Sequence, residues 1–501
     1  METVNTLRKE KLTVLNRLKE KFLFFDGAMG TMLQVAGLKA GELPEIYNVK
    51  KPDIIYNIHK DYLDAGADII TTNTFGANRL KLKDENYSVE EIVHAAVTIA
   101  KNAIGNRSDK YVALDIGPIG TLLQPLGTLS FEDAYEMFKE QVLAGVKAGA
   151  DLIIIETMSD LYEAKAAILA AKENSNLPVF CTMTFQDDER TFTGTDVLTM
   201  VSVLEGLRVD ALGVNCSRGP KELQFTVEEI LKYSHLPVIV QANAGLPKMI
   251  DDNIFFDSSE EEFSKEIQLM AKKGVAIFGG CCGTTPEYIK NIKTDLKNLK
   301  PSIPNPPKLT TAASASKTVI FDEEVKIIGE RINPTGKKIL KEALRENNIE
   351  YIVKEAILQQ ETGSDILDIN MGLPEIDEKA MMLKVIPEIQ SVVSIPLQID
   401  SANEDVIESA VRIYNGKPII NSVNGKKDSM DKIFPIVKKY GALVIALTLD
   451  GNGIPKTAEK RLEIATRIIE YAKKYGIDEE DILIDPLVLT ASAEQEKVFE
   501  T

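Results

Sequence analysis

Val275–Thr284 reads VAIFGGCCGT: an apolar run leads through two glycines directly into the adjacent cysteines Cys281 and Cys282. The run 275–278 predicts a buried strand that ends at the glycines. Adjacent cysteines rarely bond to each other because the closed ring strains the peptide, whereas two neighbouring thiolates can bind one soft metal ion. Only four cysteines occur in 501 residues, so this pair indicates a metal site at the end of a strand.

The same kind of apolar run occurs eight times in the first 300 residues. The runs are Phe22–Phe25, Ile69–Asn73, Val112–Ile116, Leu152–Glu156, Val179–Met183, Ala211–Asn215, Val238–Gln241 and Val275–Phe278. Nearly continuous apolar runs are typical of parallel strands buried on both faces, and helical patterns lie between them. Eight β/α units in this length predict a (β/α)8 TIM barrel, and we assign residues 1–300 to it.

A second β/α series follows a segment rich in proline and small polar residues, which predicts a linker over 301–320. Its strands are predicted at Lys326–Gly329, Ile366–Ile369, Leu397–Ile399, Ile419–Asn421, Leu443–Leu447 and Ile482–Ile484. Six strands fall short of the eight of a complete barrel. We therefore expect an α/β protein with two TIM barrels in tandem, the second, 321–501, being truncated at the C-terminus of this chain.

Composition argues against several classes of function. A formal net charge of −18 disfavours nucleic acid or an anionic membrane surface as a partner. The N-terminal segment lacks the apolar core of a signal peptide, and no apolar run reaches the roughly 18 residues of a membrane span. Few cysteines in a long chain fit a reducing compartment. We expect a cytoplasmic protein.

Three of the four cysteines follow predicted strands of the first barrel. Cys216 comes directly after the sixth strand, and Cys281 and Cys282 come after the eighth. Because active sites of TIM barrels lie at the carboxyl ends of the strands, these thiols should converge at the barrel mouth. Three cysteine ligands leave a fourth position open, as in a catalytic zinc site. The alternative, a buried and inert cysteine, is kept for Cys181, inside the fifth strand.

Polar residues also end other strands of this barrel, namely Asp26, Asn73 and Glu156, and Asp115 lies within the third strand. Each alone could be a helix cap or a charge on the rim. Together they place carboxylates near the cysteines, while the backbone N–H groups of 27–30 could bind a substrate carboxylate. A thiol, an ammonium and a carboxylate describe a small thiol amino acid as the substrate.

The second series ends its strands in carboxylates and amides, without cysteine or histidine. The residues are Glu330, Asp368, Asn370, Asp400, Asn421 and Asp485. Asp and Asn after strands can be ordinary turn residues. Their recurrence at the ligand-binding edge of a barrel favours a site that hydrogen-bonds a flat heterocycle.

Short motifs in the two domains resemble those of two known protein families. The first domain resembles the homocysteine methyltransferases and the second resembles the pterin-binding domain of folate-dependent methyltransferases. The first-domain motifs are Phe25-Asp26-Gly27-Ala28-Met29-Gly30-Thr31, Thr72-Asn73-Thr74-Phe75, Asp115-Ile116-Gly117-Pro118 and Gly279-Gly280-Cys281-Cys282-Gly283-Thr284. The second-domain motifs are Gly329-Glu330-Arg331-Ile332-Asn333 and Asp368-Ile369-Asn370. The domain order is similar to the N-terminal half of cobalamin-dependent methionine synthases.

The resemblance implies a catalytic centre in the first barrel. Cys216, Cys281 and Cys282 would hold Zn²⁺, with Asn243 as the fourth ligand until the sulfur of homocysteine displaces it. Asp26 and Glu156 would bind the homocysteine ammonium. In the second barrel, the six strand-end residues Glu330, Asp368, Asn370, Asp400, Asn421 and Asp485 would bind the pterin of methyltetrahydrofolate.

The implied reaction moves a methyl group from 5-methyltetrahydrofolate, via cobalamin, to the zinc-activated homocysteine thiolate, giving methionine and tetrahydrofolate. No DxHxxG motif, which supplies the cobalt-ligating histidine in that family, occurs in the sequence. We therefore expect methylcobalamin to be bound by a module absent from this chain, either a cobalamin-binding domain or a separate corrinoid protein. Two alternatives remain open: a cobalamin-independent homocysteine methyltransferase with a sulfonium or betaine donor, and a non-enzymatic zinc or folate-storage protein.

Overall fold

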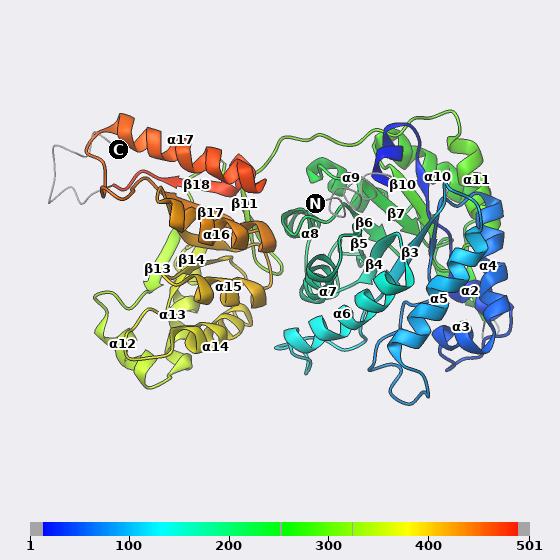
Figure 1. Ribbon diagram of the computed structural model, residues 1–501, viewed down its shortest axis with the longest axis horizontal. Coiled ribbons are helices and arrows are strands. Elements are labelled where there is room, and N and C mark those ends of the chain that lie inside the picture. Colours follow the sequence, from blue (N-terminus) through cyan, green and yellow to red (C-terminus); the bar gives the residue numbers. More distant parts are fainter. Residues whose placement is uncertain (1–13, 251–252, 323, 489–501) are drawn as a thin grey trace. The chain divides into compact units, whose positions relative to one another are not determined.

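The computed structural model describes residues 14–250, 253–322 and 324–488. The chain folds as two compact units (Figure 1). The first comprises the residues up to Glu205 together with Val209–Pro306, and the second comprises Gly206–Arg208 and the residues from Pro307 onward. Among the described residues, no helix combines the length and the apolar character that crossing a membrane would require.

The first unit is built on eight parallel strands. They are β1 (Leu23–Phe24), β2 (Ile69–Thr71), β3 (Tyr111–Ile116), β4 (Leu152–Met158), β5 (Val179–Met183), β6 (Ala211–Asn215), β7 (Val238–Ala242) and β10 (Ile277–Gly280). The sheet order is β1-β10-β7-β6-β5-β4-β3-β2. A parallel bridge between Phe25 and Ile69 joins the two ends of the sheet, and the Asp26 N–H donates to the Ile69 carbonyl at 3.0 Å. The sheet is therefore closed, which confirms the predicted barrel.

Helices surround this barrel (Figure 1). They are α2 (Met29–Val35), α3 (Tyr47–Lys50), α4 (Pro52–Ala65), α5 (Val89–Ile104), α6 (Phe131–Ala148), α7 (Leu161–Asn174), α8 (Val197–Gly206), α9 (Gln224–Tyr233), α10 (Glu260–Lys273) and α11 (Pro286–Leu296). Local sequence fixes several ends: Ser88 and Glu91 form a reciprocal capping box at the start of α5, and Gly66 ends α4 with a φ of 112°. A hairpin of β8 (Pro247–Ile250) and β9 (Asn253–Phe256) follows β7.

The barrel interior is filled by apolar side chains from all around the sheet. The buried cluster includes Leu23, Phe25, Ile69, Ala113, Leu152, Ile154, Phe180, Ala211, Ile239 and Ile277. Gly213 on β6 has no room for a side chain, because a Cβ atom there would lie 1.9 Å from the Ile239 carbonyl oxygen. Such an interior is a packed core, so ligands must bind at its ends.

The described part of the second unit contains six parallel strands in chain order. They are β13 (Ile328–Ile332), β14 (Ile366–Asn370), β15 (Leu397–Asp400), β16 (Ile419–Asn424), β17 (Leu443–Leu447) and β18 (Ile482–Asp485). The intervening helices are α12 (Lys338–Arg345), α13 (Ile349–Glu361), α14 (Glu378–Gln390), α15 (Glu404–Ile413), α16 (Lys427–Tyr440) and α17 (Ala458–Tyr475). Sequential parallel order with helical crossovers is the wall of a (β/α) barrel.

Part of the predicted linker is structured. Residues 311–320 form a hairpin of β11 (Thr311–Ala313) and β12 (Thr318–Ile320). Its Ala312 and Val319 are buried against Ile366, Ile419 and Leu443, which begin three strands of the second sheet. The hairpin therefore covers the N-terminal end of this sheet. The interpretation of 311–320 as linker was wrong because its small residues are buried apolar contacts rather than solvated spacers.

Candidate metal centre and substrate cavity

The three cysteines predicted to share a metal lie together at the barrel mouth. The Sγ atoms of Cys216, Cys281 and Cys282 are all within 4.8 Å of one another. Backbone hydrogen bonds extend the sheet ladder to two of them: the Cys216 N–H donates to the Gln241 carbonyl at 3.0 Å, and the Cys281 N–H donates to the Ala242 carbonyl at 2.8 Å. The cysteines are thus positioned by the ends of β6, β7 and β10.

Thiols this close cannot all ionise unless a cation accompanies them. Hydrogen bonds from the Cys281 and Cys282 thiols lower the pKa of Cys216 to about 3. Interaction with Cys216 in turn raises the pKa of Cys282 to about 12, and raises that of Cys281 well above its usual range. A divalent cation would remove this conflict by stabilising all three thiolates.

Asn243 provides a fourth donor beside the cysteines. Its side chain is buried, and its Oδ1 atom has no hydrogen-bond partner among the residues that the structure describes. Its N–H donates to the Arg218 carbonyl at 3.0 Å, and the next N–H, that of Ala244, donates to the Cys282 carbonyl at 2.9 Å. Tetrahedral zinc with Zn–S bonds of about 2.3 Å separates its sulfurs by about 3.8 Å, within the spacing of this cluster. The spacing of the three sulfurs therefore fits a zinc ion, and Asn243, whose side chain hydrogen-bonds Cys216, is a candidate for the fourth ligand.

A cavity of about 240 Å³ opens beside the cysteines. Its lining comprises Asp26, Gly27, Ala28, Met29, Gly30, Thr31, Pro44, Glu45, Thr71, Thr72, Asn73, Phe75, Asp115, Glu156, Thr157, Cys216, Gln241, Gly280, Cys281 and Cys282. Four of these residues carry a carboxyl group, and none of them is basic. The cavity is suited to a small ligand that brings its own positive charge.

Asp26 and Glu156, both predicted site residues, line this cavity. Asp26 is 2% exposed and accepts hydrogen bonds from the Thr71 N–H at 2.9 Å and the Thr71 hydroxyl at 3.0 Å. Burial raises the pKa of Asp26 to about 8. Burial and then the charge of Cys216 raise the pKa of Glu156 to about 7. A cation bound in the cavity would lower the pKa values of both carboxyls again.

Gly27–Gly30 line the cavity as expected, but one of their N–H groups is already engaged. The Ala28 N–H donates to the Thr284 hydroxyl at 3.2 Å. That hydroxyl also excludes side chains at Gly27 and Gly280, where a Cβ atom would lie 2.6 Å and 2.2 Å from it. The glycines of both motifs thus allow the two loops to approach each other.

Sequence reasoning missed Glu45 and Gln241. Glu45 comes from a short 3-10 helix (Pro44–Ile46) outside the β/α repeat, and it accepts from the Gly76 N–H at 2.6 Å; no strand-end signal could reveal it. Gln241 is the penultimate residue of β7. Its Nε2 lies 3.5 Å from Glu156 Oε2, and its buried Oε1 has no hydrogen-bond partner in the described part of the chain. Its position at the end of the predicted strand was the available signal.

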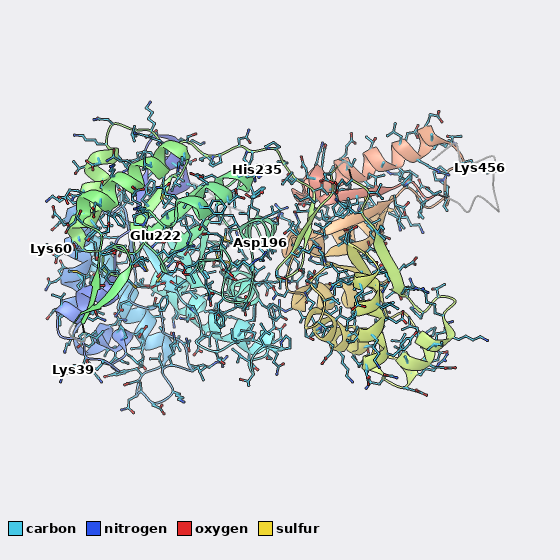
Figure 2. The ribbon with its side chains drawn as sticks, turned by 180° about the vertical axis from the view of Figure 1, so that it is seen from behind. Lys39, Lys60, Asp196, Glu222, His235 and Lys456 are labelled. Atoms are coloured by element: carbon cyan, nitrogen blue, oxygen red, sulfur yellow. The ribbon has the colours of Figure 1, made fainter. Side chains whose placement is uncertain are left out.

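No histidine of the described residues lines this cavity. Figure 2 labels one of the three, His235, whose Nδ1 lies 3.2 Å from Glu205 Oε2 and whose Nε2 lies 3.0 Å from the Pro306 carbonyl oxygen. Glu205 lies on α8 and Pro306 is the last residue of the first unit, so His235 links two segments of that unit.

The predicted pterin-binding residues lie along one edge of the second sheet. Asn370, Asp400 and Asn421 are register partners on β14, β15 and β16. Asn370 Nδ2 donates to Asp400 Oδ2 at 2.9 Å. Neighbouring carboxylate and amide groups at the carboxyl ends of parallel strands form a hydrogen-bonding surface at the ligand-binding edge.

Asp368 and Glu330 lie next to these residues. Asp368 is 2% exposed, and its Oδ1 accepts from the Gln398 amide at 2.6 Å. Within the described ranges its Oδ2 has no hydrogen-bond partner. Burial, followed by repulsion from Asp400, raises the pKa of Asp368 to about 7. Glu330 was expected to follow its strand, but it lies inside β13, at a register irregularity between Gly329 and Ile332.

Asp485 ends β18 and has a local role. Its Oδ1 accepts from the Leu487 N–H at 2.7 Å, and its carbonyl accepts from the Thr448 N–H at 3.1 Å. The first contact is the turn-stabilising bond that an Asp after a strand commonly makes. A ligand contact by Asp485 would have to use its other oxygen.

Each of the two units matches a known protein family. The model of a family described as Homocysteine S-methyltransferase matches residues 23–296, and that of Pterin binding enzyme matches residues 329–499. The chain is 31% identical to methionine synthase of Mycobacterium tuberculosis and 30% identical to that of Mycobacterium leprae. Each alignment covers 97% of this chain and 43% of the relative. The chain thus spans less than half the length of these curated relatives.

Among solved structures, the metallated homocysteine methyltransferase MmuM from Escherichia coli aligns with 57% of this chain and 99% of its own, with a TM-score of 0.50 and 24% identity. This likeness supports the barrel fold of the first unit. The family match covers more than half of the chain, including the whole cysteine cluster and all four carboxyls of the cavity. The chain belongs to the homocysteine S-methyltransferase family.

Proposed function

We propose that the first barrel binds Zn²⁺ through Cys216, Cys281 and Cys282, and that homocysteine sulfur replaces Asn243 as the fourth ligand. The observation that carries this proposal is the group of three Sγ atoms within 4.8 Å of one another, beside the buried and unpartnered Asn243 Oδ1. When bound, zinc supplies the Lewis acidity that keeps a coordinated thiol ionised yet nucleophilic at neutral pH.

The cavity residues would orient homocysteine at that centre. Asp26 and Glu156 would accept hydrogen bonds from its ammonium, since both are carboxyl groups of a lining without basic side chains. Backbone N–H groups of 27–30 would bind its carboxylate, with the Ala28 N–H excepted because Thr284 uses it. This arrangement would hold the sulfur next to the cysteines, in position to react.

We propose the overall reaction of a cobalamin-dependent 5-methyltetrahydrofolate–homocysteine S-methyltransferase. The methyl group of 5-methyltetrahydrofolate passes by way of cobalamin to the homocysteine thiolate, giving methionine and tetrahydrofolate. The pterin would lie on the second-unit residues Glu330, Asp368, Asn370, Asp400, Asn421 and Asp485. The match of residues 329–499 to pterin-binding enzymes supports a folate donor over a sulfonium or betaine donor.

The proposed partner is a cobalamin-binding domain or a separate corrinoid protein that visits both barrels. The reaction needs reduced thiols, which suits a cytoplasmic location.

A donor comparison tests this function. Zinc-loaded protein should form methionine from homocysteine with methylcobalamin, and not with betaine or S-methylmethionine. The Cys216→Ala variant should lose zinc and this activity, whereas Cys181→Ala, which removes a buried thiol outside the cluster, should keep both. Activity with betaine or S-methylmethionine alone, or full zinc and activity in Cys216→Ala, would contradict the proposal.

A further inference from the structure

A substrate ammonium has three N–H donors and therefore needs three acceptors. Both oxygens of Asp26 already accept from Thr71, and Glu156 has Gln241 within 3.5 Å. These two carboxyls can share an ammonium through Glu156 and the remaining lone pairs of Asp26. A third acceptor from the cavity lining would complete its hydrogen bonding.

Asp115 provides such an acceptor. Asp115 is the penultimate residue of β3. It lines the cavity and is 6% exposed. Its Oδ1 atom is buried and has no hydrogen-bond partner among the described residues. A buried acceptor left unpaired is destabilising, and native proteins rarely retain one without a ligand, water or functional reason.

The backbone of Asp115 is held on both sides, so its side chain is not free to leave the cavity wall. Its N–H donates to the Thr72 hydroxyl at 3.1 Å, and its carbonyl accepts from the Thr74 hydroxyl at 2.7 Å. Both threonines belong to the loop after β2. The position of Asp115 between Asp26 on one side of the mouth and Glu156 on β4 is therefore fixed by the sheet.

The charges around Asp115 also favour a cationic ligand. Burial is the main reason that its pKa is raised well above the usual range, and Glu156, Asp26 and Glu45 raise it further. Lys81 offsets part of this effect, but it lies outside the lining and its ammonium donates to the Pro118 carbonyl at 3.0 Å. The cavity lining itself offers four carboxyls and no positive charge.

We propose that Asp115 Oδ1 accepts a hydrogen bond from the substrate ammonium, completing with Asp26 and Glu156 a three-carboxylate site that selects amino thiols over thiols without an amine. This inference rests on the proposed function, because it takes homocysteine as the ligand. It adds a specificity-determining residue that is separate from the metal ligands.

The test compares two ligands on zinc-loaded protein by calorimetry. Homocysteine carries the amine, and 4-mercaptobutanoate is the same thiol acid without it. Replacing Asp115 by Asn removes the charge at nearly constant volume, and losing one charged hydrogen bond corresponds to about 10- to 100-fold in affinity. Asp115→Asn should lower the affinity for homocysteine by that factor. It should change the affinity for 4-mercaptobutanoate by less than about threefold.

Asp151→Asn is the matched control, because Asp151 lies at the opposite end of β4 and pairs with Lys101; it should bind both ligands as the unaltered protein does. An equal loss for both ligands in Asp115→Asn, or no loss for either, would overturn the inference. Asp115→Ser provides a second variant without the carboxylate, should the Asn variant fail to fold. Failure of the unaltered protein to bind homocysteine at its zinc would instead contradict the proposed function.

Discussion

Asp26 should make the stability of the metal-free first barrel fall as the pH rises. Its pKa is raised from an ordinary value of 3.8 to about 8, with burial as the largest cause. A raised carboxyl pKa means that the folded state binds a proton that the unfolded chain releases. The stability from this protonated carboxyl is fully present below about pH 4 and is lost as the pH rises through about 8.

The size of the effect follows from the shift. One pH unit corresponds to about 1.4 kcal/mol of unfolding free energy, and the full shift corresponds to about 6 kcal/mol. Between pH 5.5 and 7.5 the loss should be about 2 to 3 kcal/mol. Asp26→Asn stays neutral at every pH, so it should escape this loss.

Urea unfolding of metal-free, reduced protein, followed by circular dichroism at pH 5.5 and 7.5, measures the difference. The Asp26→Asn variant should lose about 2 to 3 kcal/mol less than the unaltered protein over this interval. Asp187→Asn, at an exposed position of the same unit, should follow the unaltered protein. The contrary result is that Asp26→Asn and the unaltered protein lose the same unfolding free energy between pH 5.5 and 7.5, to within about 0.5 kcal/mol. In that case Asp26 is ionised in the empty cavity and the burial argument is wrong.

Three further changes test other parts of the account. Asn243→Ala removes the unpartnered oxygen beside the cysteines, so chelator competition should show zinc held about 10-fold more weakly without homocysteine and unchanged with it. Gly213→Ala places a methyl group 1.9 Å from the Ile239 carbonyl oxygen, and thermal unfolding should show a loss of about 3 kcal/mol or more. Asn370→Asp replaces the amide that donates to Asp400 at 2.9 Å by a like charge; equilibrium dialysis should show weaker methyltetrahydrofolate binding at unchanged zinc content.

The barrel could be predicted from the sequence because its strands are short, nearly continuous apolar runs separated by helical patterns. The eight runs correspond to the eight strands of the closed sheet, and Cys281 follows the last of them directly, as expected. Small residues gave the wrong interpretation at 311–320, where Ala312 is completely buried. Burial of alanine depends on a tertiary neighbour, which no local pattern reveals.

The candidate site was predictable where it follows strand ends. Cys216, Cys281, Cys282, Asp26 and Glu156 all line one cavity, and their roles remain predictions.

Glu45 could not be found by the same reasoning, because it reaches the cavity from a short helix outside the repeat. Asp115 was among the carboxylates that the sequence marked. Only the three-dimensional structure shows that its buried Oδ1 lacks a hydrogen-bond partner among the described residues.

Zinc X-ray absorption with and without homocysteine tests the central claim most directly. The account predicts a shell of three sulfurs and one lighter atom, from Cys216, Cys281, Cys282 and Asn243, in the substrate-free protein. Adding homocysteine should convert it to four sulfurs at about 2.3 Å. A shell that stays unchanged on adding homocysteine, or that contains fewer than three sulfurs at the start, would contradict the account.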